Sequence, residues 1–188
     1  MNSVYRLQPM DCGEDIYPSP LGNLMRITSF VDACLGYCKV TGKSITGIIH
    51  LINQTPIKYF CKLQNTVETT TYGSEFVATK QCAEQVRELQ ETLKLIGIAI
   101  KESAWMLGDN SSVITPSTIP SSVLKKHHQA LSYHYVHTCV AHGFLKFCFL
   151  KSEQNVADTC TKFLPFVNFW PLIQPLLFWK GNTLSDVN

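Results

Sequence analysis

The first part of the chain carries apolar segments that predict β-strands. Residues 24–35 form an apolar run, 44–52 are rich in β-branched residues, and 57–63 form a further strand-like segment. Residues 53–56 (Asn-Gln-Thr-Pro) contain turn-forming types and separate the last two segments. The pattern therefore predicts three strands, of which the second and third form a hairpin.

The spacing of apolar residues then changes to steps of three and four, which is typical of an amphipathic helix. The positions that follow this spacing after Glu75 are Phe76, Thr79, Cys82, Ala83, Val86, Leu89, Leu93 and Ile96. Thr70 and Thr71 are suitable N-cap residues, and Gly97 is a natural residue just beyond the helix end.

Shorter elements are predicted in the remainder of the chain. Residues 105–107 and 144–150 are strand-like, and residues 123–142, followed by a glycine, predict a helix. Between them, 111–122 is a polar Ser/Thr/Pro stretch with no predicted element. A last short helix, with Asn155 as its cap, follows. Strands that alternate with helices in this order indicate a mixed α/β layered fold.

The two ends of the chain differ from its middle. Residues 1–22 have no hydrophobic period and contain several Pro and Gly, so we interpret them as a leader, before a domain over 23–165 and an apolar tail over 166–188. The apolar stretch 163–179 contains three prolines and falls short of the roughly 20 residues that span a membrane. We expect no membrane span and no continuous helix there, because proline interrupts helices.

We expect this apolar tail to pack on the domain or on a polyprotein partner. Without such a partner its exposed aromatic residues would favour aggregation, and deletion of the residues after Pro165 would improve solubility.

Composition narrows the class of protein. Hydrophobic residues make up 45% of the 188 residues, enough for a buried core, and the net charge of +2 gives no dominant electrostatic attraction to nucleic acid or membrane. Eight cysteines occur without a Cys-x-x-Cys pair, and the start of the chain lacks the apolar core of a secretion signal. We therefore expect reduced thiols and a cytoplasmic or nuclear, non-secreted protein.

Four acidic residues stand out by their positions. Asp32 lies within an apolar strand, Glu75 in the first turn of the long helix, Asp109 directly after a strand, and Asp158 at the start of the last short helix. A carboxylate in an apolar strand is unfavourable unless it is paired or binds a metal ion. Such residues can converge on Mg²⁺. Each could also be a solvated loop or cap residue, so their spacing alone does not establish a site.

Short sequence motifs surround these acids. They are Phe30-Val31-Asp32-Ala33, Thr46-Gly47, Thr55–Ile57, Lys62–Thr69, Tyr72–Ala78, Gly108–Val113, Leu124–Lys126 with His128, Tyr133-His134 and Asn155–Lys162. In kind and order they resemble the ribonuclease H domain of copia-type retrotransposon (LTR) Pol polyproteins. The resemblance is nearly collinear from about Asn23 to Pro165.

The resemblance implies an α/β, RNase H-like fold with a five-stranded mixed sheet flanked by helices. It also implies a metal-dependent endonuclease that hydrolyses the RNA strand of RNA–DNA hybrids with two Mg²⁺ ions, or Mn²⁺. By the same resemblance, the catalytic and metal-binding residues are Asp32, Glu75, Asp109 and Asp158. The substrate-binding candidates are Ser74, Asn110, Lys125, Lys126 and His128.

The chain departs from the family pattern at several basic positions. Gly42-Lys43-Ser44 has fewer basic residues than the family, Gly108 replaces Cys or Thr, and Tyr135 and His137 follow where arginine is common. Fewer basic side chains weaken contacts to phosphate. The alternative function is therefore a catalytically dead retrotransposon remnant that folds and binds nucleic acid or a partner.

Two other functions are disfavoured. An integrase-type enzyme normally ends its acid set with Glu, whereas this chain has Asp158. Zinc binding by His134 and His137 lacks further ligands at suitable spacing. The sequence also contains no Tyr-x-Asp-Asp polymerase motif, so a reverse transcriptase partner is expected on another chain.

Overall fold

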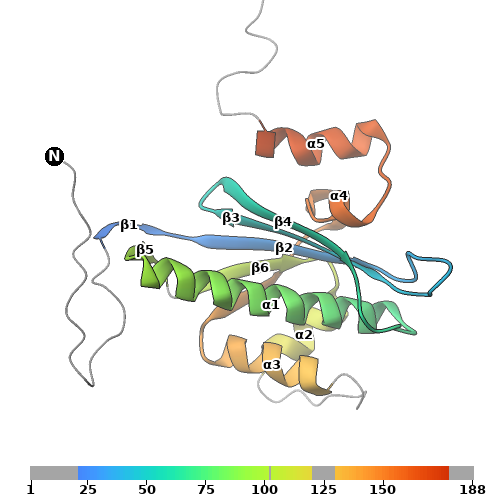
Figure 1. The fold of residues 1–188 in the computed structure, drawn as a ribbon, viewed down its shortest axis with the longest axis horizontal. Helices are drawn as coiled ribbons and strands as arrows, with labels where there is room; N and C mark the ends of the chain where they lie inside the picture. Colours follow the sequence, from blue (N-terminus) through green and yellow to red (C-terminus); the bar gives the residue numbers. More distant parts are fainter. Residues whose placement is uncertain (1–20, 102, 120–129, 178–188) are drawn as a thin grey trace, which may run out of the picture.

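The computed structural model describes residues 21–101, 103–119 and 130–177 (Figure 1). The elements are β1 (Leu21–Met25), β2 (Ile27–Cys34), β3 (Ile45–Ile52), β4 (Thr55–Leu63), α1 (Thr71–Leu95), β5 (Ile98–Ile100), β6 (Ala104–Gly108), α2 (Ser111–Thr118), α3 (Ala130–Ala141), β7 (Leu145–Phe149), η2 (Ser152–Gln154), α4 (Asp158–Thr161) and α5 (Phe166–Leu177).

A five-stranded mixed sheet in the order β4-β3-β2-β6-β7 forms the centre of the fold. β2 and β4 pair antiparallel with β3, whereas β6 pairs parallel with both β2 and β7. The expected fold class is confirmed. The single strand expected over 24–35 is divided at Arg26 into β1 and β2. β1 pairs with β5, a short strand that the sequence pattern did not predict.

Helices cover both faces of this sheet. α1, α2 and α3 lie on one face, and α4 and α5 lie on the other (Figure 1). Successive residues of β3 face opposite sides of the sheet. Ile48 packs in the larger core with Phe76 of α1, whereas Ile49 packs on the other face with Leu172 of α5. Burial on both faces explains why this strand is a continuous apolar run without alternation.

Helix boundaries follow the capping signals where these are strong. The Thr70 hydroxyl accepts a hydrogen bond from the backbone N–H of Gly73 at 3.2 Å, and Gly97 follows the helix with a φ of +75°. α2 was not predicted, because polar residues surround its buried Val113 and Ile114. The helix expected over 123–142 is described from Ala130, and its earlier part lies outside the described residues.

The expectation that prolines would interrupt the tail is wrong, because α5 runs continuously through Pro171 and Pro175. Both prolines are exposed and four residues apart, so the carbonyl groups that lose a helical donor lie on the solvent side. The buried Leu172 anchors the opposite side of the helix. In the described ranges, no helix has both the length and the apolar character to cross a membrane.

Candidate functional site

Asp32 and Asp109 are brought together by the parallel pairing of β2 with β6. Phe30 lies opposite Leu107 in this pair, and each aspartate follows two residues later. Because the carboxyl ends of parallel strands meet at the same edge of a sheet, the two side chains occupy one region. The carbonyl of Gly108 accepts a hydrogen bond from the Leu150 N–H at 2.8 Å, which keeps the end of β6 paired.

Glu75 reaches the same region from the first turns of α1. Gln64, just after β4, fixes this part of the helix to the sheet. Its side-chain amide donates to the Thr46 hydroxyl at 3.1 Å and to the Ser74 carbonyl at 2.8 Å. The start of α1 is therefore held against β3, and Glu75 points toward the strand ends.

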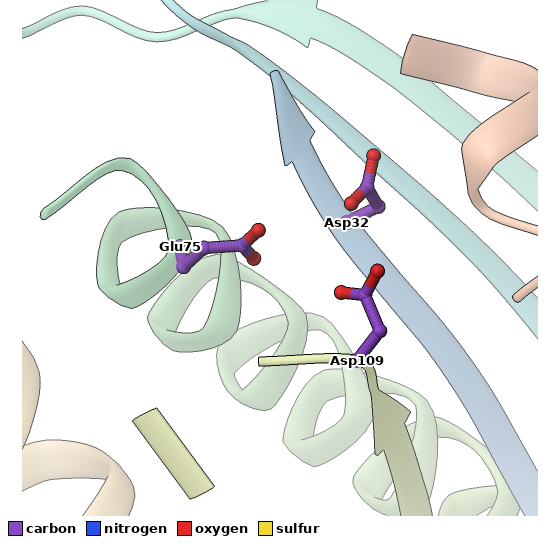
Figure 2. A group of neighbouring side chains, drawn as sticks. All are labelled: Asp32, Glu75 and Asp109. Atoms are coloured by element: carbon purple, nitrogen blue, oxygen red, sulfur yellow. The ribbon is translucent and has the colours of Figure 1, made fainter. Parts of the chain in front are cut away.

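These three carboxylates form a compact group, called here the acid triad: Asp32, Glu75 and Asp109. One oxygen from each lies within 4.8 Å of the others, and Figure 2 shows the three side chains pointing toward one another. Asp32 is 1% exposed and Glu75 is 6% exposed, while Asp109 is half-buried. Asp109 is thus the most exposed member of the triad.

The triad is electrostatically crowded. Burial, together with Asp32 and Asp109, raises the pKa of Glu75 to about 9. Burial also raises the pKa of Asp32, although the Thr161 hydroxyl and Lys162 oppose this shift. A divalent cation bound by the ionised forms would relieve such repulsion, and carboxylate oxygens are its preferred ligands. The donor set therefore fits a hard divalent cation.

Asp158 is not a member of the acid triad, but it lies near Asp32, and Lys162 links the two. It begins α4, whose Thr161 hydroxyl donates a short hydrogen bond to Asp32 Oδ2. Lys162 Nζ lies 2.9 Å from Asp158 Oδ2 and 3.5 Å from Asp32 Oδ1. Burial raises the pKa of Asp158 despite this ammonium group. The structure thus brings together three of the four expected acids and links the fourth to them through a lysine.

The turn before α4 is fixed by Asn155. Its side-chain amide donates to the Val31 carbonyl at 3.0 Å, and its Oδ1 accepts from the Ala157 N–H at 3.2 Å. The N-cap position itself is Ala157, not Asn155 as the sequence suggested. Asn155 instead attaches the turn to β2, beside Asp32.

The expected substrate-binding residues have different environments. Asn110 is the N-cap of α2, with its Oδ1 accepting from the Ser112 N–H at 3.1 Å. Ser74 is fully buried, and its hydroxyl donates to the Thr71 carbonyl at 2.9 Å. Lys125, Lys126 and His128 lie outside the described residues.

Thr161 and Lys162 were not singled out in the sequence, although their motif was. The available signal was spacing, since Lys162 follows Asp158 by four residues and such pairs share one face of a helix.

The histidines of α3 make other contacts. His137 Nε2 lies 3.3 Å from the Ile119 carbonyl, and its ring stacks on Tyr133. The acid triad is the single group of three or more potential metal ligands found within the described residues, and it contains no histidine.

Comparison with curated proteins identifies distant sequence relatives. The chain is 27% identical over 123 residues to the retrovirus-related Pol polyprotein of transposon TNT 1-94 from Nicotiana tabacum, covering 65% of this chain and 9% of that protein. It is 24% identical over 148 residues to the Pol polyprotein of transposon RE2 from Arabidopsis thaliana, covering 79% and 10%. The chain thus spans about a tenth of these relatives. No protein-family model matches it.

Solved structures with the same fold are ribonucleases H. The N-terminal RNase H domain of a Mycobacterium tuberculosis protein has a TM-score of 0.54 at 13% identity, covering 80% of this chain and 97% of that chain. RNase H1 of Halobacterium salinarum has a TM-score of 0.53 at 11% identity, covering 69% and 89%. LC11-RNase H1 in complex with an RNA/DNA hybrid has a TM-score of 0.53 at 13% identity, covering 69% of this chain and 88% of that chain. Sequence and fold together support a diverged ribonuclease H domain of a retrotransposon Pol polyprotein.

Proposed function

We propose that this domain is a metal-dependent endonuclease that hydrolyses the RNA strand of RNA–DNA hybrids. The observation that carries the proposal is the acid triad, whose ligand oxygens lie within 4.8 Å of one another. Asp32 and Asp109 come from two parallel strands, and Glu75 comes from the facing helix α1. A ribonuclease H neighbour in complex with an RNA/DNA hybrid supports this choice of substrate. The proposal includes a copia-type origin and a cytoplasmic or nuclear location.

The residues present fit two divalent cations of the Mg²⁺ or Mn²⁺ class. The acid triad would hold one, and Asp32 with Asp158 would hold the other. When bound, such cations polarise the scissile phosphodiester and activate water, so no protein nucleophile is needed. The protein's own part is to fix the carboxylates: Thr161 orients Asp32 by its hydrogen bond, and Asn155 anchors the turn before Asp158.

Substrate contacts complete the proposal. Lys125, Lys126 and His128 would contact the phosphate backbone beside the acids, and Asn110 is a further proposed contact. Ser74 was expected to bind substrate, but it is fully buried and its hydroxyl donates to the Thr71 carbonyl, so its proposed part is to hold the turn of α1 that carries Glu75. A reverse transcriptase domain on another chain would add further binding surface for the hybrid.

A catalytically dead remnant is the second candidate, and one observation favours it. Tyr135 and His137 stand where arginine is common in the family, and His137 Nε2 is already occupied by the Ile119 carbonyl. The remnant would fold and bind nucleic acid or a partner without cleaving it.

A strand-specific cleavage assay separates the two candidates. With Mg²⁺ or Mn²⁺, the purified protein should cut labelled RNA in a hybrid and leave duplex DNA intact. Asp32→Asn should abolish cutting, whereas the exposed Glu153→Gln should retain it. Hybrid binding without cleavage in either metal would contradict the nuclease and support the remnant.

A further inference from the structure

The side chain of Lys162 occupies the space between Asp32 and Asp158. Its Nζ is 2.9 Å from Asp158 Oδ2 and 3.5 Å from Asp32 Oδ1. The two acidic side chains are 7% and 2% exposed, while that of Lys162 is 35% exposed. The Lys162 side chain therefore extends from the surface to the two carboxylates of Asp32 and Asp158, called here the acid pair, and part of it is exposed to solvent.

The backbone of Lys162 is held in place, whereas its side chain is 35% exposed. Its N–H donates to the Asp158 carbonyl at 2.8 Å at the end of α4. α4 in turn packs on Gly47 of β3 so closely that a Cβ on Gly47 would lie 2.8 Å from Cys160 Cβ and 2.9 Å from the Ala157 carbonyl oxygen. Movement of the ammonium group thus requires only rotation of a partly exposed lysine side chain.

The acid pair is not fully satisfied by this lysine. Asp158 Oδ2 accepts from Lys162 and from the Ser152 hydroxyl at 3.2 Å, but the buried Oδ1 has no hydrogen-bond partner within the part of the chain that the structure describes. A buried carboxylate oxygen without a partner is unfavourable. A cation with several coordination positions would satisfy it better than one ammonium group does.

We propose that the Lys162 ammonium group occupies the site of the second divalent cation and competes with this cation for Asp32 and Asp158. This inference rests on the proposed function. The first ion binds the acid triad, to which Lys162 has no direct contact except at Asp32. The second ion binds between Asp32 and Asp158 only when Lys162 turns outward. The two ions therefore bind with unequal affinity, and Lys162 sets the difference.

Mn²⁺ titration of the intact protein, with free Mn²⁺ counted by electron paramagnetic resonance, tests this inference. The wild type should bind one ion tightly and a second weakly. Lys162→Met keeps the length of the side chain but removes its charge. It should tighten the second ion about tenfold and the first ion by less, because Asp32 is the one acid of the triad that Lys162 contacts. The control Lys80→Met removes a surface lysine paired with Glu84, and should change neither affinity.

A second variant covers the case in which Lys162→Met fails to fold. Lys162→Arg keeps the charge and adds a guanidinium group that can contact both carboxylates, so it should weaken the second ion relative to the wild type. Asp158→Asn should remove the second ion in every background.

Several outcomes would overturn the inference. A second ion that is unchanged or weaker in Lys162→Met would make the lysine a structural ion pair, as would unchanged or tighter binding in Lys162→Arg. Either result, with the first ion still bound, leaves the proposed function standing. A wild type that binds no Mn²⁺ contradicts both the inference and the proposed function.

Discussion

Glu75 is an acid whose ionisation the fold changes strongly. Its ordinary pKa is 4.5, and burial with Asp32 and Asp109 nearby raises it to about 9. The folded protein thus binds a proton at Glu75 over a range of pH in which the unfolded chain has lost it. Its charge at neutral pH then depends on whether a cation is present.

Stability without metal should fall as the pH rises from about 5 to 9. Because the folded state binds more protons in this range, each pH unit removes at most about 1.4 kcal/mol for this one group. Urea unfolding in chelator at several pH values measures this slope. Glu75→Gln should flatten it, whereas Glu153→Gln, at an exposed position, should not. An equal slope in wild type and Glu75→Gln would contradict the raised pKa.

Asp109→Asn should separate electrostatic repulsion from metal binding. The change removes one negative charge from the acid triad at nearly constant size, so stability in chelator should be unchanged or higher. The rise in melting temperature on addition of Mg²⁺ should become smaller, because a ligand is lost. Melting curves in chelator and in Mg²⁺ measure both effects. If wild type and variant gain equally from Mg²⁺, Asp109 is not a ligand.

At the scale of elements, the contact between α4 and β3 places Asp158 and Lys162 beside Asp32. Gly47 lies opposite Asp32 in the β2–β3 pair, and its missing side chain leaves room for α4. An added Cβ would meet Thr161 Cγ2 at 2.6 Å. Thr161 is also the residue that donates to Asp32, so this packing and the orientation of the acid are linked.

Gly47→Ala should therefore displace α4 and impair the site. We expect a loss of about 1–3 kcal/mol from overpacking, together with loss of hybrid cleavage and a smaller response to Mg²⁺. Gly36→Ala is the matched control. Its Cβ would meet nothing within 4 Å, although its φ of +59° adds backbone strain. Urea unfolding and the cleavage assay should show that only Gly47→Ala affects both stability and activity.

Elements with strong local signals could be predicted from the sequence. The turn over 53–56 and the Thr70 cap mark their elements clearly, and the structure places β3, β4 and α1 close to the predicted ranges. α2 and β5 lack such signals, since one is mostly polar and the other is a three-residue strand. The continuity of α5 depends on which side of the helix packs, which local sequence does not show.

The candidate site was predictable only in part. The parallel pairing that places Asp109 beside Asp32 follows from the fold that the motifs implied, and Glu75 follows from the position of the long helix. The position of the Lys162 ammonium group depends on how closely α4 approaches β3. This distance between two elements could not be predicted from the sequence. Metal binding by the acids stays a prediction.

At the scale of the whole molecule, α5 completes the second layer of the protein. Leu172 is buried with Ile49, Leu51 and Val156, so this helix covers an apolar face of the sheet. Its other side exposes Phe166 and Val167, which are 70% and 79% exposed. The tail therefore combines a packed side with an apolar surface. Because deletion after Pro165 would uncover core residues, we now expect it to lower solubility, in contrast to the expectation from sequence.

Two substitutions on the two sides of α5 should affect different properties. Leu172→Ala should lower the free energy of unfolding by about 2–4 kcal/mol, because it empties a buried position. Val167→Thr should change stability by less than about 0.5 kcal/mol and reduce aggregation, because its position is exposed. Urea unfolding and light scattering measure the two quantities. Equal stability of Leu172→Ala and wild type would show that α5 does not complete the core.

The contacts that join α4 to β2 close very long loops of chain. The hydrogen bond from Asn155 to Val31 spans 124 residues, and the pair Lys162–Asp32 spans 130. Contacts of such long range are slow to form, whereas the β3–β4 hairpin and α1 depend on local contacts. During refolding, Asp158 should therefore join Asp32 after most secondary structure is present. We therefore expect the chemistry proposed for the domain to become available late in refolding, after most of the helix content has formed.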